Sequence, residues 1–320
     1  MRHLLVLAAL VVALDARAVT IDWVEVGPAY SPDRPPPTDC LTSPPDCGFV
    51  DHAYFISKYE TTNAQYAEFL NAKAASDPML LYNPSMEGDN FSGGITRSGV
   101  SGSFTYTAKV DFENKPVTYV SFYDALRFAN WLHNGQGSGD TETGAYTITP
   151  DGITNNTIAR NPGANVFLTS ENEWYKAAYA GFDGLSATYF DYPAGTNTAT
   201  VCAAPTATAN RANCDVAVGA VTNVGAYTGS ASPYGTFDQG GNVYEWNETR
   251  SGSLNRGFRG GSWLNYGGIL AASVPLFNDA TSEDDYIGFR VASLAPEPGT
   301  GMLVMAGVLA LSASRRRRAN

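Results

Sequence analysis

The chain has 320 residues, 44% of them apolar, and it carries 20 basic and 31 acidic side chains for a net charge of −11. This length allows one large domain or two small ones, and the acidic balance argues against nucleic-acid binding, which needs basic patches. Only 16% of the residues are charged, whereas glycine and tyrosine are abundant, with 32 and 18 residues. That composition is typical of a loop-rich, exported α+β domain rather than a helical one.

The first 18 residues have the pattern of a secretory signal peptide. Arg2 and His3 precede an apolar run from Leu4 to Leu14, and residues 16–18 read A-R-A. The run is too short to span a bilayer as a folded helix, and A-x-A is a cleavage pattern. We therefore expect the mature chain to begin at Val19, although a buried N-terminal helix is the alternative.

Residues 19–49 are expected to form an extension ahead of the main domain. Residues 19–26 are apolar enough for an opening strand, whereas residues 31–47 contain six prolines and are expected to be loop.

The chain has four cysteines, Cys40, Cys47, Cys202 and Cys214. An even number in an exported chain favours disulfides. Proximity along the sequence suggests the pairs Cys40–Cys47 and Cys202–Cys214, although four cysteines allow three pairings. A reactive thiol pair is the alternative, but neither pair has the C-x-x-C spacing.

The first predicted helix follows a strand over residues 54–60. A Thr or Asn among residues 61–63 is expected to cap it, and Tyr66, Phe69 and Leu70 form one apolar face of a helix that runs to Ala74. Residues 77–115 are polar and rich in Gly and Ser, with strand-like pieces near residues 104–110.

Two more helices are predicted, each with the pattern of a capping box. A strand over residues 116–120 precedes a helix that Ser121 and Asp124 open and that ends near His133. A surface hairpin is expected over residues 134–162. A strand over residues 166–169 then precedes a helix that Ser170 and Glu173 open, with Gly181 as its stop.

The densest group of motifs lies between residues 232 and 263. Gly240-Gly241 allows a positive φ or a close backbone approach. Residues 242–246, N-V-Y-E-W, alternate in the manner of a strand, and residues 259–263, R-G-G-S-W, are predicted to start a second one.

Three motifs together resemble the formylglycine-generating enzyme, or sulfatase-modifying factor, family. They are G-T-F-D-x-x-G-N-V-x-E-W over residues 235–246, R-G-G-S-W over 259–263, and G-F-R over 288–290. The resemblance implies one domain over residues 50–293 with an α+β, C-type-lectin-like fold, which is loop-rich and has few short helices and twisted antiparallel strands.

Active members of that family are copper-dependent oxidases that convert a sulfatase cysteine to formylglycine. They resemble one another in a Cys pair just after R-G-G-S, which supplies the soft thiolates that Cu(I) prefers. Here the two positions are Asn265 and Leu270, and no Cys follows Cys214. Copper binding is therefore not expected. The two histidines beyond the signal peptide, His52 and His133, are too few for the His-rich iron site of related enzymes.

Calcium is the metal that the resemblance favours. The family's calcium site on the G-N-V-x-E segment implies the side chains of Asp238 and Glu245 and the carbonyls of Gly241 and Val243. Such oxygen atoms are the ligands that Ca²⁺ takes in irregular loops. The alternative is structural, with Glu245 pairing with an Arg and Asp238 capping a turn.

The resemblance also implies a ligand groove near R-G-G-S. An aromatic, Asn-containing lining of this kind suits an extracellular polysaccharide or peptide. The alternative is that Trp263 and Tyr244 belong to the core. The expected lining is Tyr244, Ser262, Trp263, Asn265, Tyr266, Phe277 and Asn278.

The last segment, residues 294–320, resembles the PEP-CTERM signal of Gram-negative bacteria. Pro296-Glu297-Pro298 precedes an apolar run over residues 302–311 and four consecutive Arg, residues 315–318. The resemblance implies transient membrane anchoring and processing by an exosortase-type enzyme. A plain tail anchor is the alternative, although the run is shorter than the ~20 residues that a stable span needs.

These observations predict an exported, surface or matrix protein of the family that is non-catalytic and binds a ligand. The first alternative is a copper-dependent oxidase that makes formylglycine. The second is a ligand-display protein that varies between residues 264 and 287. Without the two terminal segments, 14 basic and 29 acidic residues remain, a charge close to −15, which again argues against a nucleic-acid partner.

Overall fold

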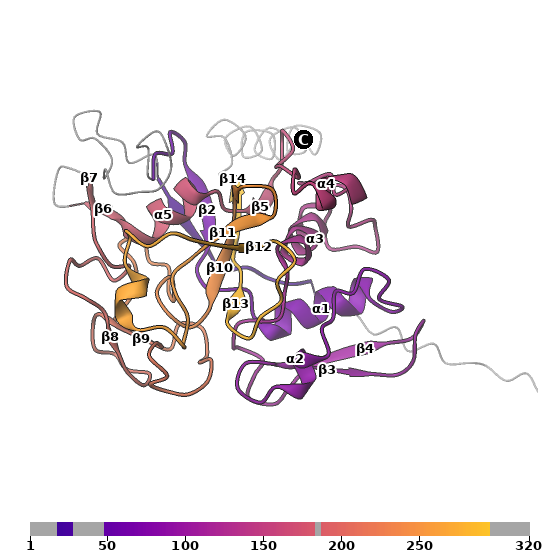
Figure 1. Ribbon diagram of the computed structural model, residues 1–320, viewed down its shortest axis with the longest axis horizontal. Helices are drawn as coiled ribbons and strands as arrows, with labels where there is room; N and C mark the ends of the chain where they lie inside the picture. The colour runs from indigo at the N-terminus through magenta and orange to yellow at the C-terminus, as the bar shows by residue number, and fades with distance from the viewer. Residues whose placement is uncertain (1–17, 28–47, 183–186, 295–320) are drawn as a thin grey trace, which may run out of the picture.

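Two four-stranded sheets form the centre of the computed structural model, which describes residues 18–27, 48–182 and 187–294 (Figure 1). The first sheet has the order β1-β2-β14-β5 and is antiparallel throughout. Its strands are β1 (Trp23–Val26), β2 (Tyr54–Ser57), β5 (Val166–Leu168) and β14 (Val291–Leu294). Strand β1 thus belongs to the sheet of the main domain, although the sequence analysis assigned it to an N-terminal extension.

The second sheet has the order β12-β11-β10-β13. Strands β10 and β13 are parallel, and the other neighbours are antiparallel. Its strands are β10 (Tyr244–Ser251), β11 (Asn255–Arg259), β12 (Leu276–Asp279) and β13 (Ile287–Gly288). The smaller pairs are β3 (Ile95–Ser98) with β4 (Thr105–Ala108), β6 (Ala180–Phe182) with β7 (Ala187–Tyr189), and β8 (Val201–Cys202) with β9 (Arg211–Ala212).

The three predicted helices are confirmed, and each begins with a capping box that satisfies N–H groups of its first turn. The caps are Thr62 with Gln65 for α1 (Asn63–Lys73), Ser121 with Asp124 for α3 (Phe122–His133), and Ser170 with Glu173 for α5 (Glu171–Tyr179). Helices α2 (Ser85–Gly88), α4 (Pro150–Thr154) and the 3₁₀ helix η1 (Gly267–Leu270) are short. Figure 1 shows α1 and α3 on one side of the central strands and α5 on the other. The prediction of a loop-rich α+β fold with short helices and antiparallel strands is confirmed.

The hydrophobic core is mainly aromatic between α1, α3 and the first sheet. The rings of Tyr66, Phe69, Phe128 and Phe289 are buried and meet mostly edge to face, for example Phe128 and Phe289 with centroids 5.3 Å apart. This is the preferred arrangement of aromatic pairs. No helix among the described residues is long and apolar enough to cross a membrane.

Two local predictions were wrong, and a third was right only about position. Residues 116–120 are not a strand, because Tyr119 has a φ of +59° and only the bridge Thr62–Pro116 forms. Helix α5 ends at Tyr179 with Ala180 as its cap, so Gly181 follows the helix end as predicted, but it lies in β6, where a Cβ would come within 2.9 Å of Phe190 and Pro233. Residues 259–263 end a strand rather than start one, since β11 stops at Arg259 and the next two glycines have φ of +97° and +72°.

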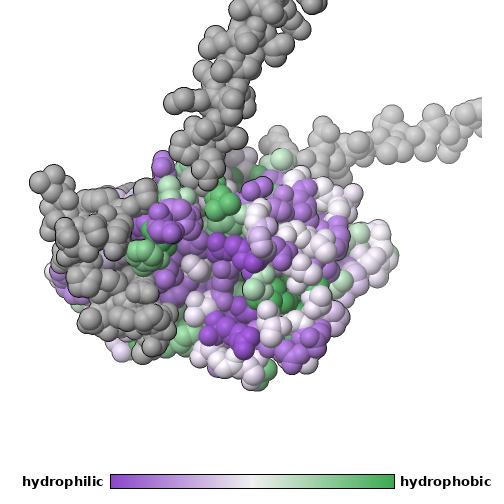
Figure 2. Space-filling model, turned by 90° about the horizontal axis from the view of Figure 1, so that it is seen from above, coloured by the Kyte–Doolittle hydropathy of each residue, from purple (hydrophilic) through white to green (hydrophobic). Residues whose placement is uncertain are grey.

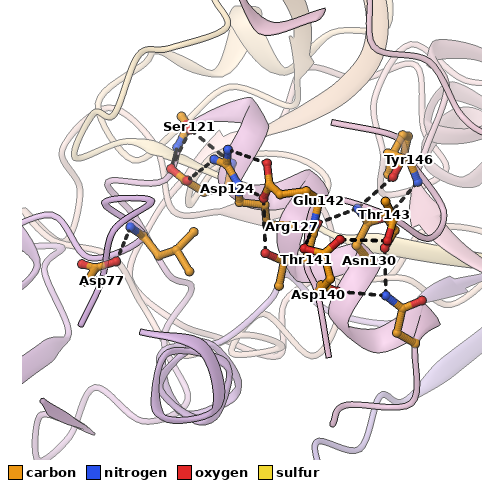
Figure 3. Close-up of polar contacts among 12 residues, drawn as sticks. Asp77, Ser121, Asp124, Arg127, Asn130, Asp140, Thr141, Glu142, Thr143 and Tyr146 are labelled. Atoms are coloured by element: carbon orange, nitrogen blue, oxygen red, sulfur yellow. Dashed lines mark hydrogen bonds and ion pairs between the residues drawn. The ribbon is translucent and has the colours of Figure 1, made fainter. Parts of the chain in front are cut away.

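Residues 134–162 also differ from the predicted surface hairpin. They contain α4 and one isolated bridge, Tyr146–Arg160, and Tyr146 is fully buried. Figure 3 shows the cause: Asn130 of α3 donates to the carbonyls of Thr141 and Tyr146 at 2.7 and 3.0 Å and accepts from Tyr146 N at 2.8 Å. Arg127 binds Glu142 at 2.7 Å beside it. The loop is therefore held against α3 by buried polar groups.

The outer surface is mixed in polarity. Seen from above, hydrophilic residues fill much of the centre of the face, and hydrophobic residues lie among them (Figure 2). Scattered apolar residues of this kind are normal on a folded surface.

Candidate functional site

The charged residues of the motifs form a buried ion pair between the two sheets. Arg290 donates from Nε and Nη2 to the two oxygens of Glu245 at 2.5 and 2.6 Å, and neither side chain is exposed. Trp174 Nε1 donates to the same carboxylate at 2.6 Å. The remaining N–H groups of Arg290 go to backbone carbonyls, those of Ser57, Lys58 and Phe237.

Three further ion pairs lie at or beside α5, and the one between Arg259 and Glu171 is almost fully buried. Arg259, the last residue of β11, donates to Glu171, the first residue of α5. Arg160 lies between Glu173 and Glu248, at 2.7 Å from each. Removing one partner of such a pair is costly because the other charge is left buried without a counter-charge. The motif residues Glu245, Arg259 and Arg290 are thus structural in this chain.

The four predicted calcium ligands do not fit an ion in this arrangement. Both oxygens of Glu245 are bound to the Arg290 guanidinium, so a divalent cation there would face a positive charge at close range. Asp238 Oδ2 accepts from Gly225 N at 2.5 Å, which corresponds to the predicted alternative of a turn cap. Groups of three His, Cys, Asp or Glu placed to hold a metal are absent from the described residues.

The other two predicted ligands, Gly241 and Val243, have backbone roles. Gly241 has a φ of +84°, and a Cβ on it would lie 2.4 Å from the carbonyl oxygen of Asn213. The close approach that the glycine pair predicted is therefore real. The N–H of Val243 donates to Glu60 Oε1 at 3.2 Å.

Two more buried carboxyls adjoin the Glu245–Arg290 pair. Burial, followed by the charges of Asp238 and Glu245, raises the pKa of Glu60 well above its usual range. Burial also raises the pKa of Asp238, to about 6, against the Gly225 hydrogen bond and the Arg290 charge. One guanidinium therefore lies near three buried carboxyl groups, and burial disfavours the ionised forms of Glu60 and Asp238.

The raised pKa of Asp238 predicts that this residue makes the protein less stable as the pH rises. Below its ordinary pKa of 3.8 the carboxyl is protonated in both states, so it has no effect. Between 3.8 and about 6 only the unfolded chain releases the proton, and the free energy of unfolding falls. The free energy of unfolding, measured by urea at several pH values from 4 to 8, should therefore fall less for Asp238→Asn than for the wild type. Parallel curves for the two proteins would contradict this.

The two positions of the family's copper cysteines are used structurally. Asn265 Oδ1 accepts from the N–H and the hydroxyl of Ser262 at 2.9 and 2.8 Å. Leu270 is fully buried and packs with Ala212, Cys202 and Cys214. Neither position offers a soft ligand, so the residues present do not fit Cu(I).

One of the two suggested disulfides is confirmed. Cys202 of β8 and Cys214 are bonded, with Cα atoms 4.9 Å apart. Cys40 and Cys47 lie outside the described residues. No free thiol remains among the cysteines that the structure describes, so a reactive pair at Cys202 and Cys214 is excluded there.

The seven residues of the predicted groove do not form one surface. Tyr244, Ser262 and Trp263 are buried, and Tyr244 packs edge-on against Phe258 with ring centroids 4.3 Å apart. Asn265 is half-buried, as are Phe277 and Asn278 of β12, whereas Tyr266 is 63% exposed. The alternative interpretation, that Tyr244 and Trp263 belong to the core, describes these two residues correctly.

Sequence reasoning named the exposed Tyr266 but missed two exposed residues near it, Leu264 and Val216. Leu264 is two positions before Tyr266 and is exposed. The exposed Val216 lies next to the same loop, because Val216 N donates to Trp263 O at 2.8 Å and Asp215 N donates to Asn265 O at 2.7 Å. Val216 has a φ of +55°, an unfavourable value for a β-branched residue that often marks a functional site. No sequence signal announces a positive φ at Val, so only the structure could reveal it.

Comparison with known proteins places this geometry in a family. The model of the sulfatase-modifying factor enzyme 1-like domain matches residues 24–295. A crystal structure of CarF is 23% identical, with a TM-score of 0.55, and the match covers 87% of this chain and all of that one. Treponema denticola variable protein 1 is 19% identical, with a TM-score of 0.55, and the match covers 88% of this chain and 97% of that one. No curated protein matches. The two structures share the fold, and the matching model shows that the chain belongs to the family of the sulfatase-modifying factor enzyme 1-like domain.

Proposed function

We propose that this domain is a non-catalytic ligand-binding domain of an exported, surface-associated protein. The main support is the state of the two positions at which active relatives carry copper cysteines. Asn265 is engaged in a turn with Ser262, and Leu270 is fully buried in a small apolar cluster. Neither side chain supplies the thiolate that copper-dependent oxidation of a sulfatase cysteine needs.

The copper test separates this proposal from the alternative, a formylglycine-generating oxidase. Purified protein incubated with one equivalent of Cu(I) should lose the metal on desalting, because no described residue offers it a thiolate. A cysteine-containing sulfatase peptide kept with the copper-treated protein in air should stay unoxidised. Stoichiometric Cu(I) retention together with aldehyde formation would favour the oxidase, and Cys202 and Cys214 would then be the first residues to replace.

The ligand surface that we propose is the exposed part of the loop after R-G-G-S-W. Tyr266 and Leu264 are exposed there. The exposed Val216 lies next to this loop through its hydrogen bond to the carbonyl of Trp263. An exposed aromatic residue with apolar neighbours suits a sugar ring or a peptide side chain, so we expect an extracellular polysaccharide or peptide.

Replacement of Tyr266 tests this surface. Tyr266→Ala should weaken retention on matrix polysaccharide from the native host about tenfold, the loss expected for a contact of ~1.4 kcal/mol. Leu254→Ala is the matched control, since Leu254 is an exposed apolar residue in the turn between β10 and β11. Equal retention of the two variants would count against the surface.

Export and surface sorting complete the proposal, with exosortase-type processing of the C-terminal segment. Residues 1–17 and 295–320, which carry nearly all of both signals, lie outside the described residues. The intact mass of protein from the native host should correspond to a chain without residues 1–18 and without the four Arg, residues 315–318. A mass that includes the Arg tail would refute the processing.

A further inference from the structure

A disulfide joins the two segments that contact the loop carrying Tyr266. We call residues 263–270 the ligand loop, because they include Leu264 and Tyr266, two exposed residues of the proposed ligand surface. Cys202 ends β8 and Cys214 follows β9, and their sulfur atoms are bonded. In Figure 1 the short orange helix η1, which forms the second half of this loop, lies beside β8 and β9. Contacts from both cysteine segments reach the loop.

The segment after Cys214 is hydrogen-bonded to the ligand loop. Asp215 N donates to Asn265 O at 2.7 Å, and Val216 N donates to Trp263 O at 2.8 Å. Both donor residues have a positive φ, +52° and +55°, which is unfavourable for a β-branched residue such as Val216. A strained backbone persists only where the surrounding structure holds it. The disulfide fixes this segment at its first residue, and the two hydrogen bonds fix the residues that follow.

The segment at Cys202 contacts the same loop at η1. A Cβ on Gly267 would lie 2.4 Å from the carbonyl oxygen of Thr200 and 3.7 Å from Cys202 Sγ. Gly267 therefore packs directly against this backbone, a close approach that a glycine permits. Leu270, at the other end of η1, is fully buried in one apolar cluster with both cysteines and Ala212. The disulfide thus adjoins both ends of η1.

The pairing between the two cysteine segments is short. Strands β8 and β9 pair over two residues each, and hydrogen bonds at Ala203 and Asn210 extend this pairing. A two-stranded pair is at best marginally stable alone in water, so the disulfide limits how far the segments can separate. Cys202 is half-buried and Cys214 is fully buried, so a thiolate reaches the bond at the Cys202 sulfur.

We propose that the Cys202–Cys214 disulfide positions the ligand loop and makes its ligand affinity sensitive to reduction, an inference that rests on the proposed function of this surface. A dithiol reductant attacks the bond through a mixed disulfide. Two electrons and two protons pass from the dithiol to the cysteines, which become thiols, and the dithiol becomes a cyclic disulfide. The segment after Cys214 then relaxes from its left-handed conformation, and its hydrogen bonds to Trp263 and Asn265 weaken.

Binding of the full chain to matrix polysaccharide from the native host tests the affinity. The polysaccharide concentration at half-maximal binding should rise about tenfold when a dithiol reduces the wild type, which corresponds to ~1.4 kcal/mol. The double variant Cys202→Ala, Cys214→Ala should show the raised value with or without the dithiol. This variant is also the control for Cys40 and Cys47, because any effect of the dithiol on it arises from those two residues.

Two readouts separate positioning from a loss of folded protein. A loss of stability alone lowers the maximal amount bound and leaves the half-maximal concentration unchanged, whereas positioning changes that concentration. Amide hydrogen exchange is the second readout and needs no ligand. In the reduced wild type the N–H groups of Asp215, Val216 and Ile269, all hydrogen-bonded at the ligand loop, should exchange about tenfold faster. The N–H groups of β2, in the other sheet, should keep their rates.

Two outcomes would overturn the proposal. The first is a half-maximal concentration and exchange rates that reduction leaves unchanged, which would mean that other contacts position the loop. The second is faster exchange in β2 as well as in the ligand loop, which would indicate general destabilisation. If the oxidised wild type does not bind the polysaccharide at all, the proposed ligand surface fails, and the exchange rates alone decide whether the disulfide positions the loop.

Discussion

Glu245→Gln is expected to lower the free energy of unfolding by about 3–5 kcal/mol, the cost of breaking a buried ion pair. The substitution leaves the Arg290 guanidinium fully buried with its charge uncompensated. It also weakens the acceptor of Trp174 Nε1, which now lies 2.6 Å from a carboxylate oxygen. A loss of this size is a large fraction of the stability of a typical domain, so the variant should be partly unfolded at 37 °C.

Urea unfolding at pH 7 measures this effect, with Glu25→Gln as a control that makes the same chemical change on the exposed side of β1. The control should change the free energy of unfolding by less than about 0.5 kcal/mol. A double-mutant cycle with Arg290→Gln should give a coupling energy of at least ~1 kcal/mol, because the two residues are in direct contact. If the losses in free energy of unfolding of the two single variants simply add up to the loss in the double variant, the ion pair is not the source of the effect.

Removal of the Cys202–Cys214 disulfide is expected to cost about 3 kcal/mol, the value for a closed loop of this length. The two cysteines are 12 positions apart, and the bond joins β8 to the segment just after β9, two strands that pair over only two residues each. The bond also packs against Leu270 in a small apolar cluster. The other contacts of this loop include hydrogen bonds such as those from Asn210 Nδ2 to the carbonyls of Thr198 and Ala199.

The double variant Cys202→Ala, Cys214→Ala can be compared with the wild type by urea unfolding, with and without reductant. Reductant should destabilise the wild type towards the level of the variant and affect the variant less. If the free energy of unfolding of the variant is lower by less than ~1 kcal/mol, the loop is fixed by its other contacts, such as the hydrogen bond from Thr200 Oγ1 to Asn210.

The helices could be predicted because their signals are local. Ser121 with Asp124 and Ser170 with Glu173 are three positions apart, so both halves of each capping box are visible in the sequence and form as expected. The same holds for Cys202 and Cys214, whose proximity suggested the bond that the structure contains. Short-range hydrogen bonds and short loops depend little on the remainder of the chain.

Errors occurred where distant segments determine the backbone. Tyr119 adopts a φ of +59° while its N–H donates to Asp284 O, a residue far along the chain, and the predicted strand is lost. Gly181 follows the end of α5 as predicted, but the reason for a glycine there is tertiary, because Phe190 and Pro233 leave no room for a Cβ. Neither contact has a signature in the sequence near the affected residue.

The sequence by itself determined the family, the three helices and the absence of a cysteine at the positions of Asn265 and Leu270. Only the tertiary structure decided what the motif residues do: both oxygens of Glu245 are bound to Arg290, which is 45 positions away and whose charge would repel a calcium ion. It also placed Tyr244 and Trp263 in the core, and Gly267 and Leu270 against the segments that the disulfide joins. The physical reason is that a carboxylate, a Trp or a hydroxyl has the same ligand chemistry in any sequence, whereas its burial and partners arise only when distant strands pack together.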